Sequence, residues 1–311
     1  MKFDFFTFGG RFFWEDLYNY QDWVIQRNII NNKCRLLDPH NIRRHSGTFA
    51  QCKDILLKYI EAYELNPLYE DTILILHGFG RSKKSVRKLA DSLKELPMNV
   101  ICLGYPSLRR NIYYHATMLS QFLKNIEVNG RLYIVNVGCG CLITRKLLSK
   151  SNNYRQYNIA RILDINPLNS GSDLAELLTT RDFFNFLLGP MLRDISTPRA
   201  VALARLPHDI EHGILFAPLT VHDRIKKLLS RFDSFPFSTP PSEESYSDNV
   251  KKIRKDTYFP LDSQTVAQYT RNYILTGEFG KLTDDDDEDD EEDDNHSVSV
   301  IIENSVDTMP I

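Results

Sequence analysis

Residues 71–170 alternate between short apolar runs and longer amphipathic segments, and this alternation constrains the fold more than any other feature of the chain. The short runs are rich in β-branched residues and apolar along their length, as in strands that are buried on both faces. The segments between them carry apolar residues at helical spacing. Parallel strands are joined by crossover helices, so the pattern predicts an open α/β fold with a doubly wound, mostly parallel sheet. The expected strands are 72–76, 99–103, 131–137 and 160–165, and the expected helices are 82–96, 111–127 and 141–150.

The sheet and its helices are expected to form a core over residues 71–280, with a helical insertion at about 171–230 and a further strand at 213–218. Residues 1–70 are rich in aromatic side chains and contain a predicted helix at about 49–64. We expect this first segment to form a lead-in that packs on the core.

Charge is distributed unevenly along the chain. Eleven of its 41 acidic residues form the uninterrupted run 284–294, DDDDEDDEEDD. Without that run, 38 Lys and Arg face 30 acids, so the body is basic although the formal net charge of the chain is −3. Like charges repel within the run, and residues 281–311 have too little apolar surface to offset the entropy of ordering. They are predicted to form a disordered acidic C-terminal tail.

Cysteine usage and hydropathy indicate a cellular compartment. Five cysteines among 311 residues are an odd and sparse set, which suits buried thiols in a reducing compartment better than a disulfide framework. The N-terminal segment lacks the long apolar stretch of a signal peptide, and no stretch reaches the roughly 18 apolar residues of a membrane span. The expected location is the cytoplasm, with no transmembrane segment.

The loop after the first predicted strand carries the most specific motif. His77-Gly78-Phe79-Gly80-Arg81-Ser82 follows that strand, and Gly-Tyr-Pro-Ser at 104–107 follows the next. This combination resembles the oxyanion loop and following strand of bacterial lipases and esterases of the α/β-hydrolase superfamily. The resemblance implies that glycines in 77–80 let backbone N–H groups approach a substrate oxygen. It covers about residues 10–280, because 23–28, 35–44, 169–178, 187–190 and 270–280 are also similar to stretches of that group, in the same order.

The resemblance predicts a nucleophile in a tight turn after strand 131–137, where those enzymes have Gly-x-Ser-x-Gly. This turn needs small residues two positions before and two positions after its apex. Centring it on Gly138 places Asn136 and Gly140 at those positions. Centring it on Cys139 or Cys141 instead crowds the turn with larger side chains. The nucleophile position is therefore predicted to be Gly138, which has no side chain that could attack a substrate.

The catalytic histidine of the superfamily is also predicted to be missing. It lies in a loop shortly before the final helix, which is expected here at about 262–276. No histidine occurs between His222 and His296, and Asp256 aligns with the histidine position. An aspartate cannot relay protons at neutral pH as imidazole does. A looser alignment leaves Asp233 as the remaining acid of the triad.

These residues lead to a pseudoenzyme hypothesis, in which the chain binds an acyl or lipid-like small molecule or a protein partner without cleaving it. The alternative is an active carboxylic-ester hydrolase that uses Cys139 as nucleophile and a relocated histidine, such as His208 or His212. The spacing of those two histidines could hold a metal on a helix, but Pro207 and Gly213 flank them and indicate a loop. No metal and no cofactor are therefore expected.

The acidic tail provides a further hypothesis. Residues 298–302, Val-Ser-Val-Ile-Ile, directly follow the acids and resemble the short motif that adds a β-strand to small ubiquitin-like modifiers. The motif residues Val298, Val300 and Ile301 predict a protein partner that binds through 284–302. The acidic block is also similar to export signals of type IV secretion effectors. It implies a host-directed bacterial effector that leaves the cell without a classical signal peptide. A nucleic-acid partner is not expected.

Overall fold

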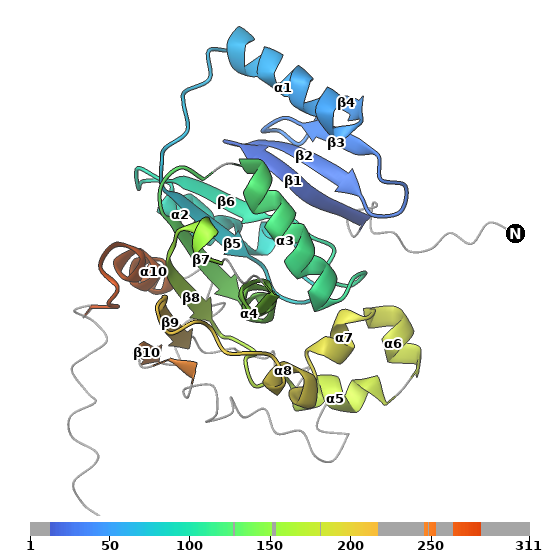
Figure 1. The fold of residues 1–311 in the computed structure, drawn as a ribbon, viewed down its shortest axis with the longest axis vertical. Coiled ribbons are helices and arrows are strands. Elements are labelled where there is room, and N and C mark those ends of the chain that lie inside the picture. The colour runs from blue at the N-terminus through green and yellow to red at the C-terminus, as the bar shows by residue number, and fades with distance from the viewer. Residues whose placement is uncertain are drawn as a thin grey trace, which may run out of the picture. The chain divides into compact units, whose positions relative to one another are not determined.

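The computed structural model describes residues 13–126, 128–150, 154–180, 182–216, 246–247, 249–252 and 264–280. Its main element is a six-stranded sheet in the order β10-β9-β8-β7-β5-β6, in which all neighbouring strands are parallel (Figure 1). This confirms the mostly parallel sheet that the sequence predicts. The strands are β5 (Thr72–Leu76), β6 (Asn99–Leu103), β7 (Leu132–Val137), β8 (Ile159–Ile165), β9 (Glu211–Phe216) and β10 (Asn249–Lys252).

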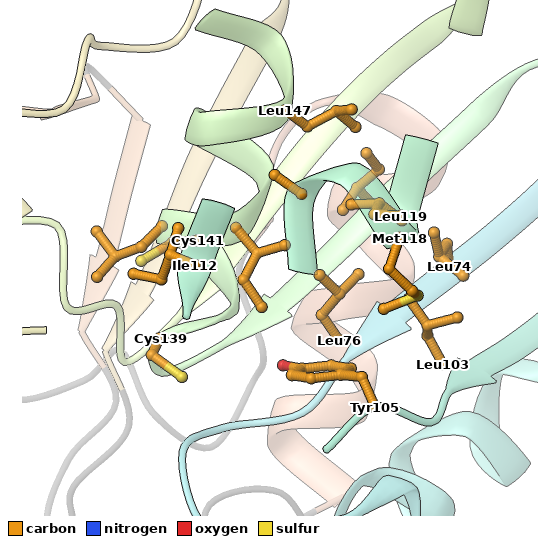
Figure 2. Packing of buried hydrophobic residues seen from close by; sticks show 14 of the residues in the cluster. Leu74, Leu76, Leu103, Tyr105, Ile112, Met118, Leu119, Cys139, Cys141 and Leu147 are labelled. Atoms are coloured by element: carbon orange, nitrogen blue, oxygen red, sulfur yellow. The ribbon is translucent and has the colours of Figure 1, made fainter. Parts of the chain in front are cut away.

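Helices cover both faces of this sheet, because its strands are apolar on both faces. On one face, α3 (Ile112–Ile126) and α4 (Gly140–Lys150) pack against Leu74, Leu76 and Ile134 in one buried cluster (Figure 2). The opposite face contacts α10 (Gln264–Thr276), which also packs on α2 (Arg87–Leu93). A short 3₁₀ helix, η2 (Lys83–Val86), precedes α2 within the single helix predicted at 82–96. The sheet is therefore doubly wound.

The region between β8 and β9 contains four short helices rather than one long one. Ser172 caps the first of them, since its side chain accepts a hydrogen bond from the Ala175 N–H. None of the described helices has the length and apolarity that crossing a bilayer requires. The helices are α5 (Asp173–Thr179), α6 (Asp182–Leu188), α7 (Met191–Asp194) and α8 (Thr197–Val201), and a second 3₁₀ helix, η3 (Tyr154–Tyr157), precedes β8.

The first segment of the chain forms an antiparallel four-stranded sheet, which the sequence analysis did not anticipate. Its strands β1 (Trp14–Tyr20), β2 (Trp23–Asn28), β3 (Cys34–Leu37) and β4 (Arg43–Gly47) pair in chain order. The predicted helix is present as α1 (Phe49–Ala62) and covers this sheet. Thr48 and Gln51 close its first turn with reciprocal hydrogen bonds, so its start is fixed by a capping box.

A buried carboxylate attaches this N-terminal sheet to the parallel sheet. Asp16 of β1 accepts hydrogen bonds from the Gly104 N–H at 2.8 Å and from Gln26 at 2.6 Å, and its own N–H donates to the Gly104 carbonyl. Glycine is required at position 104, because a Cβ there would lie 2.9 Å from the Asp16 carboxylate. The backbone after β6 and the backbone of β1 are thereby held in direct contact.

We expect Asp16→Ala to lower the free energy of unfolding by about 2–4 kcal/mol, because it leaves the Gly104 N–H and the Gln26 amide buried without an acceptor. Urea denaturation measures this loss. The control is Asp22→Asn, whose exposed side chain forms only surface ion pairs and should change stability by less than about 0.5 kcal/mol. Equal effects of the two substitutions would show that Asp16 does not fasten the two sheets.

Candidate functional site at the end of strand β7

The turn between β7 and α4 has the backbone conformation of a strained elbow. Gly138 has φ +55°, in the left-handed region that favours glycine, and its N–H donates to the Ile165 carbonyl at 3.0 Å. A Cβ at this position would meet only the Gly78 Cα, at an ordinary contact distance of 3.7 Å. The apex therefore has room for a side chain, but the residue that occupies it carries none.

Only one of the two positions that flank the apex, 136 and 140, needs a small residue. A Cβ on Gly140 would lie 3.1 Å from the Leu76 Cβ, so position 140 requires a small residue, as predicted. Asn136 is larger, yet it fits because its amide is buried and donates to Asp164 at 2.8 Å. The close approach of Leu76 therefore restricts the size of the residue at position 140, and no such contact restricts position 136.

Cys139, the fallback nucleophile, points into the protein. Its side chain is fully buried in the cluster that contains Leu76 and Tyr105, and Figure 2 shows its sulfur directed toward Tyr105. Burial raises the pKa of the thiol to about 12, although hydrogen bonds from the backbone N–H groups of Cys139 and Phe79 oppose this. The thiol is therefore protonated at neutral pH, whereas a cysteine nucleophile must be a thiolate.

The structure brings the two motifs of the sequence analysis together. Gly78 faces the apex at Gly138, and the Gly80 N–H donates to the Ser107 hydroxyl at 3.1 Å. The Tyr105 hydroxyl donates to the backbone carbonyl of His77. Residues 77–80 are thus held in place by the Gly-Tyr-Pro-Ser segment that follows β6.

The His77 ring forms the buried base of this loop. It stacks on Tyr105 with ring centroids 4.0 Å apart, and its Nδ1 lies 2.9 Å from the Gly78 carbonyl. Complete burial lowers the pKa of His77 to about 4, and burial lowers the pKa of the neighbouring His115 to about 3. Both imidazoles are therefore neutral at physiological pH.

A buried polar network that the sequence analysis did not identify lies beside the elbow. Asp164 of β8 is 3.0 Å from the Nε2 of His212 on β9, and it accepts hydrogen bonds from Asn136 at 2.8 Å and Asn169 at 3.2 Å. Thr144 of α4 donates to Asn136. Asp164, which lies between the apolar residues Leu163 and Ile165, is the one sequence signal that could have revealed this network.

The two ring nitrogens of His212 both have partners within the protein. Nε2 contacts Asp164, and Nδ1 lies 3.1 Å from the Tyr246 carbonyl. Burial acts to lower the pKa of His212, but the Asp164 carboxylate and the Tyr246 carbonyl outweigh it and raise that pKa. His208, the other histidine considered for a relocated triad, lies exposed in a loop. In the part of the chain that the structure describes, both ring nitrogens of His212 are occupied and His208 is exposed. Neither histidine is therefore placed to take a proton at the elbow.

Several predicted site residues lie outside the described residues. They are Asp233 and Asp256 of the proposed degenerate triad and Val298, Val300 and Ile301 of the tail motif, together with residues 281–311 as a whole. Within the described ranges, no group of three or more His, Cys, Asp or Glu side chains is arranged to hold a metal ion.

No protein-family model and no curated protein matches the sequence. The solved structures that are similar include a lipase, a phospholipase and a lipase-esterase related protein. The mature lipase BlEst2 of Bacillus licheniformis is 13% identical, with a TM-score of 0.48, over 68% of this chain and 92% of the lipase. Phospholipase PlaB of Legionella pneumophila in complex with thio-NAD is 16% identical, with a TM-score of 0.40, over 47% of this chain and 37% of PlaB. A lipase-esterase related protein of Clostridium acetobutylicum is 15% identical, with a TM-score of 0.42, over 67% and 94%.

The His212–Asp164 pair predicts a pH-dependent stability. The pKa of His212 is higher in the folded state than its unfolded value of about 6.5, so folding favours the protonated ring. Its contribution is complete below about pH 6.5 and is lost as the pH rises through the folded-state pKa. The difference in the free energy of unfolding between the wild type and His212→Gln should therefore narrow as the pH rises above about 6.5, as urea denaturation can measure.

The matched control is His208→Gln, whose exposed ring forms no such pair and whose effect on stability should stay near zero at each pH. A wild-type advantage over His212→Gln that widened with rising pH would contradict the prediction, since it would mean that the neutral imidazole is the stabilising form.

Proposed function

We propose that this protein, which has the α/β-hydrolase fold, is a pseudoenzyme that binds an acyl or lipid-like ligand beside Gly138 and does not cleave it. The observation that carries the proposal is the left-handed backbone of Gly138 at the apex between β7 and α4, facing Gly78. The backbone there has the strained conformation that presents a nucleophile in hydrolases of this fold. Because the residue is glycine, no atom is available to form a covalent acyl intermediate.

The environment of Cys139 supports the absence of covalent chemistry. Its thiol is buried with a pKa of about 12, and activation would need a neighbouring base or cation. Both ring nitrogens of His212 are already hydrogen-bonded, and His77 is a fully buried neutral ring. An ester hydrolase that relied on Cys139 would need one of these groups to move.

Two backbone donors beside the apex support the binding of a carbonyl oxygen. The backbone N–H groups of Phe79 and Cys139 act to lower the pKa of the Cys139 thiol, and sulfur is a weak acceptor. A carbonyl or carboxylate oxygen is a much stronger acceptor, so a ligand that reached these donors would gain hydrogen bonds at little cost. Phe79 belongs to the loop 77–80 that the resemblance implies as an oxyanion cradle.

Decanoic acid provides a direct binding test. We expect saturable heat release on titration of the wild-type protein, and binding weakened by about tenfold or more in Gly78→Val, because the added side chain fills the space between the loop and the apex. Position 78 accepts a Cβ, whose nearest contact would be the Val137 carbonyl at 3.6 Å. Ala62→Val adds bulk at an exposed site on α1 and should bind as the wild type does. Equal affinities of the two variants would place the ligand elsewhere.

A kinetic test addresses the absence of cleavage. The wild type should hydrolyse p-nitrophenyl acetate and butyrate no faster than Cys139→Ser or the control Cys102→Ser, whose thiol lies beside α2. Gly138→Ser should not create turnover, because a serine at the apex would still lack an imidazole partner. Turnover that iodoacetamide or Cys139→Ser abolished would instead establish the cysteine hydrolase. Strong activity in Gly138→Ser would show that a functional base is present.

A further inference from the structure

A second pocket, of about 400 Å³, lies between the N-terminal sheet and the segment that follows β5. Its walls come from β1, β2 and β3 on one side and from residues 77–84 and 104–105 on the other. Gly138 and Cys139 are not among the residues that line it. The volume suits a small organic molecule rather than a bare ion.

The Arg35 guanidinium in this pocket is held in a fixed orientation. Its Nε and Nη2 donate to the Gln26 side-chain oxygen at 3.0 and 2.7 Å, and Gln26 is itself buried and hydrogen-bonded to Asp16. The guanidinium also lies over the Trp14 ring, 3.8 Å from its centroid. Among the described residues, no carboxylate forms an ion pair with Arg35. A preorganised guanidinium without a carboxylate partner is a binding group for an anion.

Two lysines add to the positive charge of the pocket. Lys83 lies 3.4 Å from the Asp16 carboxylate, and Lys84 forms no ion pair with any described residue. Arg35 and the two lysines thus bring three positive charges to the lining, against the single negative charge of Asp16. The excess of two positive charges matches a dianion and would remain partly uncompensated with a monocarboxylate.

His77 lines the same pocket and carries a buried acceptor. Its Nδ1 lies against the Gly78 carbonyl, which can only accept, so the proton is on Nδ1 and Nε2 is an acceptor. That Nε2 is buried and has no hydrogen-bond partner among the described residues. The His77 and Tyr105 rings, which stack on each other, both line the pocket. An O–H group of a ligand would satisfy the acceptor that the protein leaves unpaired.

We infer that this pocket binds an organic phosphate monoester. Arg35, Lys83 and Lys84 hold the phosphoryl group, which carries a charge of about −1.5 to −2 at pH 7. The organic part lies against Trp14 and Tyr105. This inference does not depend on the proposed function, because it uses a different pocket and no residue of the elbow.

Intrinsic fluorescence provides a direct assay, because Trp14 is one of only two tryptophans and the other, Trp23, is buried against Tyr59. Phenyl phosphate should cause a saturable change in emission that is absent in Trp14→Phe. Its affinity should exceed that of benzoate by about tenfold or more, since benzoate has the same ring but a single charge. Inorganic phosphate should bind more weakly than phenyl phosphate, because it lacks the ring.

Variants locate the site. Arg35→Ala should weaken phenyl phosphate binding by about tenfold or more, and Lys84→Ala by a smaller factor, with unchanged near-ultraviolet circular dichroism as the check on folding. Lys58→Ala removes the same charge from an exposed position on α1 and should bind as the wild type does. The inference is overturned if phenyl phosphate gives no saturable change at about 10 mM, if benzoate binds equally well, or if Arg35→Ala and Lys58→Ala behave alike.

Discussion

The left-handed backbone of Gly138 is the constraint on which the candidate site depends. It lets β7 turn into α4 within a few residues and brings the apex against Gly78. For a residue with a side chain, this conformation costs about 1–2 kcal/mol, which hydrolases of this fold accept in order to present a nucleophile. Glycine removes that strain. Under the proposed function the apex needs no nucleophile, so glycine at this position stabilises the fold without a cost to binding.

Buried ionisable groups near the elbow are hydrogen-bonded within the structure. The His212–Asp164 pair has the residue types and the spacing of a catalytic pair, with 3.0 Å between its atoms. However, Asn136 and Asn169 occupy the remaining capacity of the carboxylate, and the Tyr246 carbonyl occupies the other ring nitrogen. The pair therefore joins β8, β9 and the backbone near β10. A catalytic interpretation requires an unoccupied ring nitrogen, which His212 does not have.

Arg145 completes this arrangement from α4. It is almost fully buried, and it donates to the backbone carbonyls of Leu203, Ala204 and Asn169. Those carbonyls belong to the connections that flank the four short helices, so a single guanidinium satisfies backbone groups that no regular element pairs. The sequence alone gives position 145 no special pattern. Its structural role follows from burial, which the sequence of an amphipathic helix does not indicate for an arginine.

The parts of the fold that could be predicted are those with a repeating apolar pattern. Strands 72–76 and 99–103 have the predicted bounds, because each is a mostly apolar run; the first is fully buried, and the second lies at the edge of the sheet with Ile101 and Leu103 buried. The N-terminal sheet was missed because its strands mix charged and aromatic residues. Its first hairpin also turns at Gln21, which adopts φ +52° although neither glycine nor asparagine marks the turn. Pairings between distant strands, such as His212 with Asp164, depend on register and leave no local signal.

His77 connects the two sites that the structure presents. Its backbone begins the loop that faces Gly138, and its carbonyl accepts a hydrogen bond from Tyr105. Its ring stacks on Tyr105 and lines the pocket beside Arg35, with one nitrogen unpaired. In a hydrolase only the backbone of this loop is needed to hold an oxyanion. A fully buried histidine with an unsatisfied acceptor costs free energy, and binding to a ligand hydroxyl in the pocket would recover that cost. The proposed ligand pocket thus gives the imidazole a role that an oxyanion loop does not require.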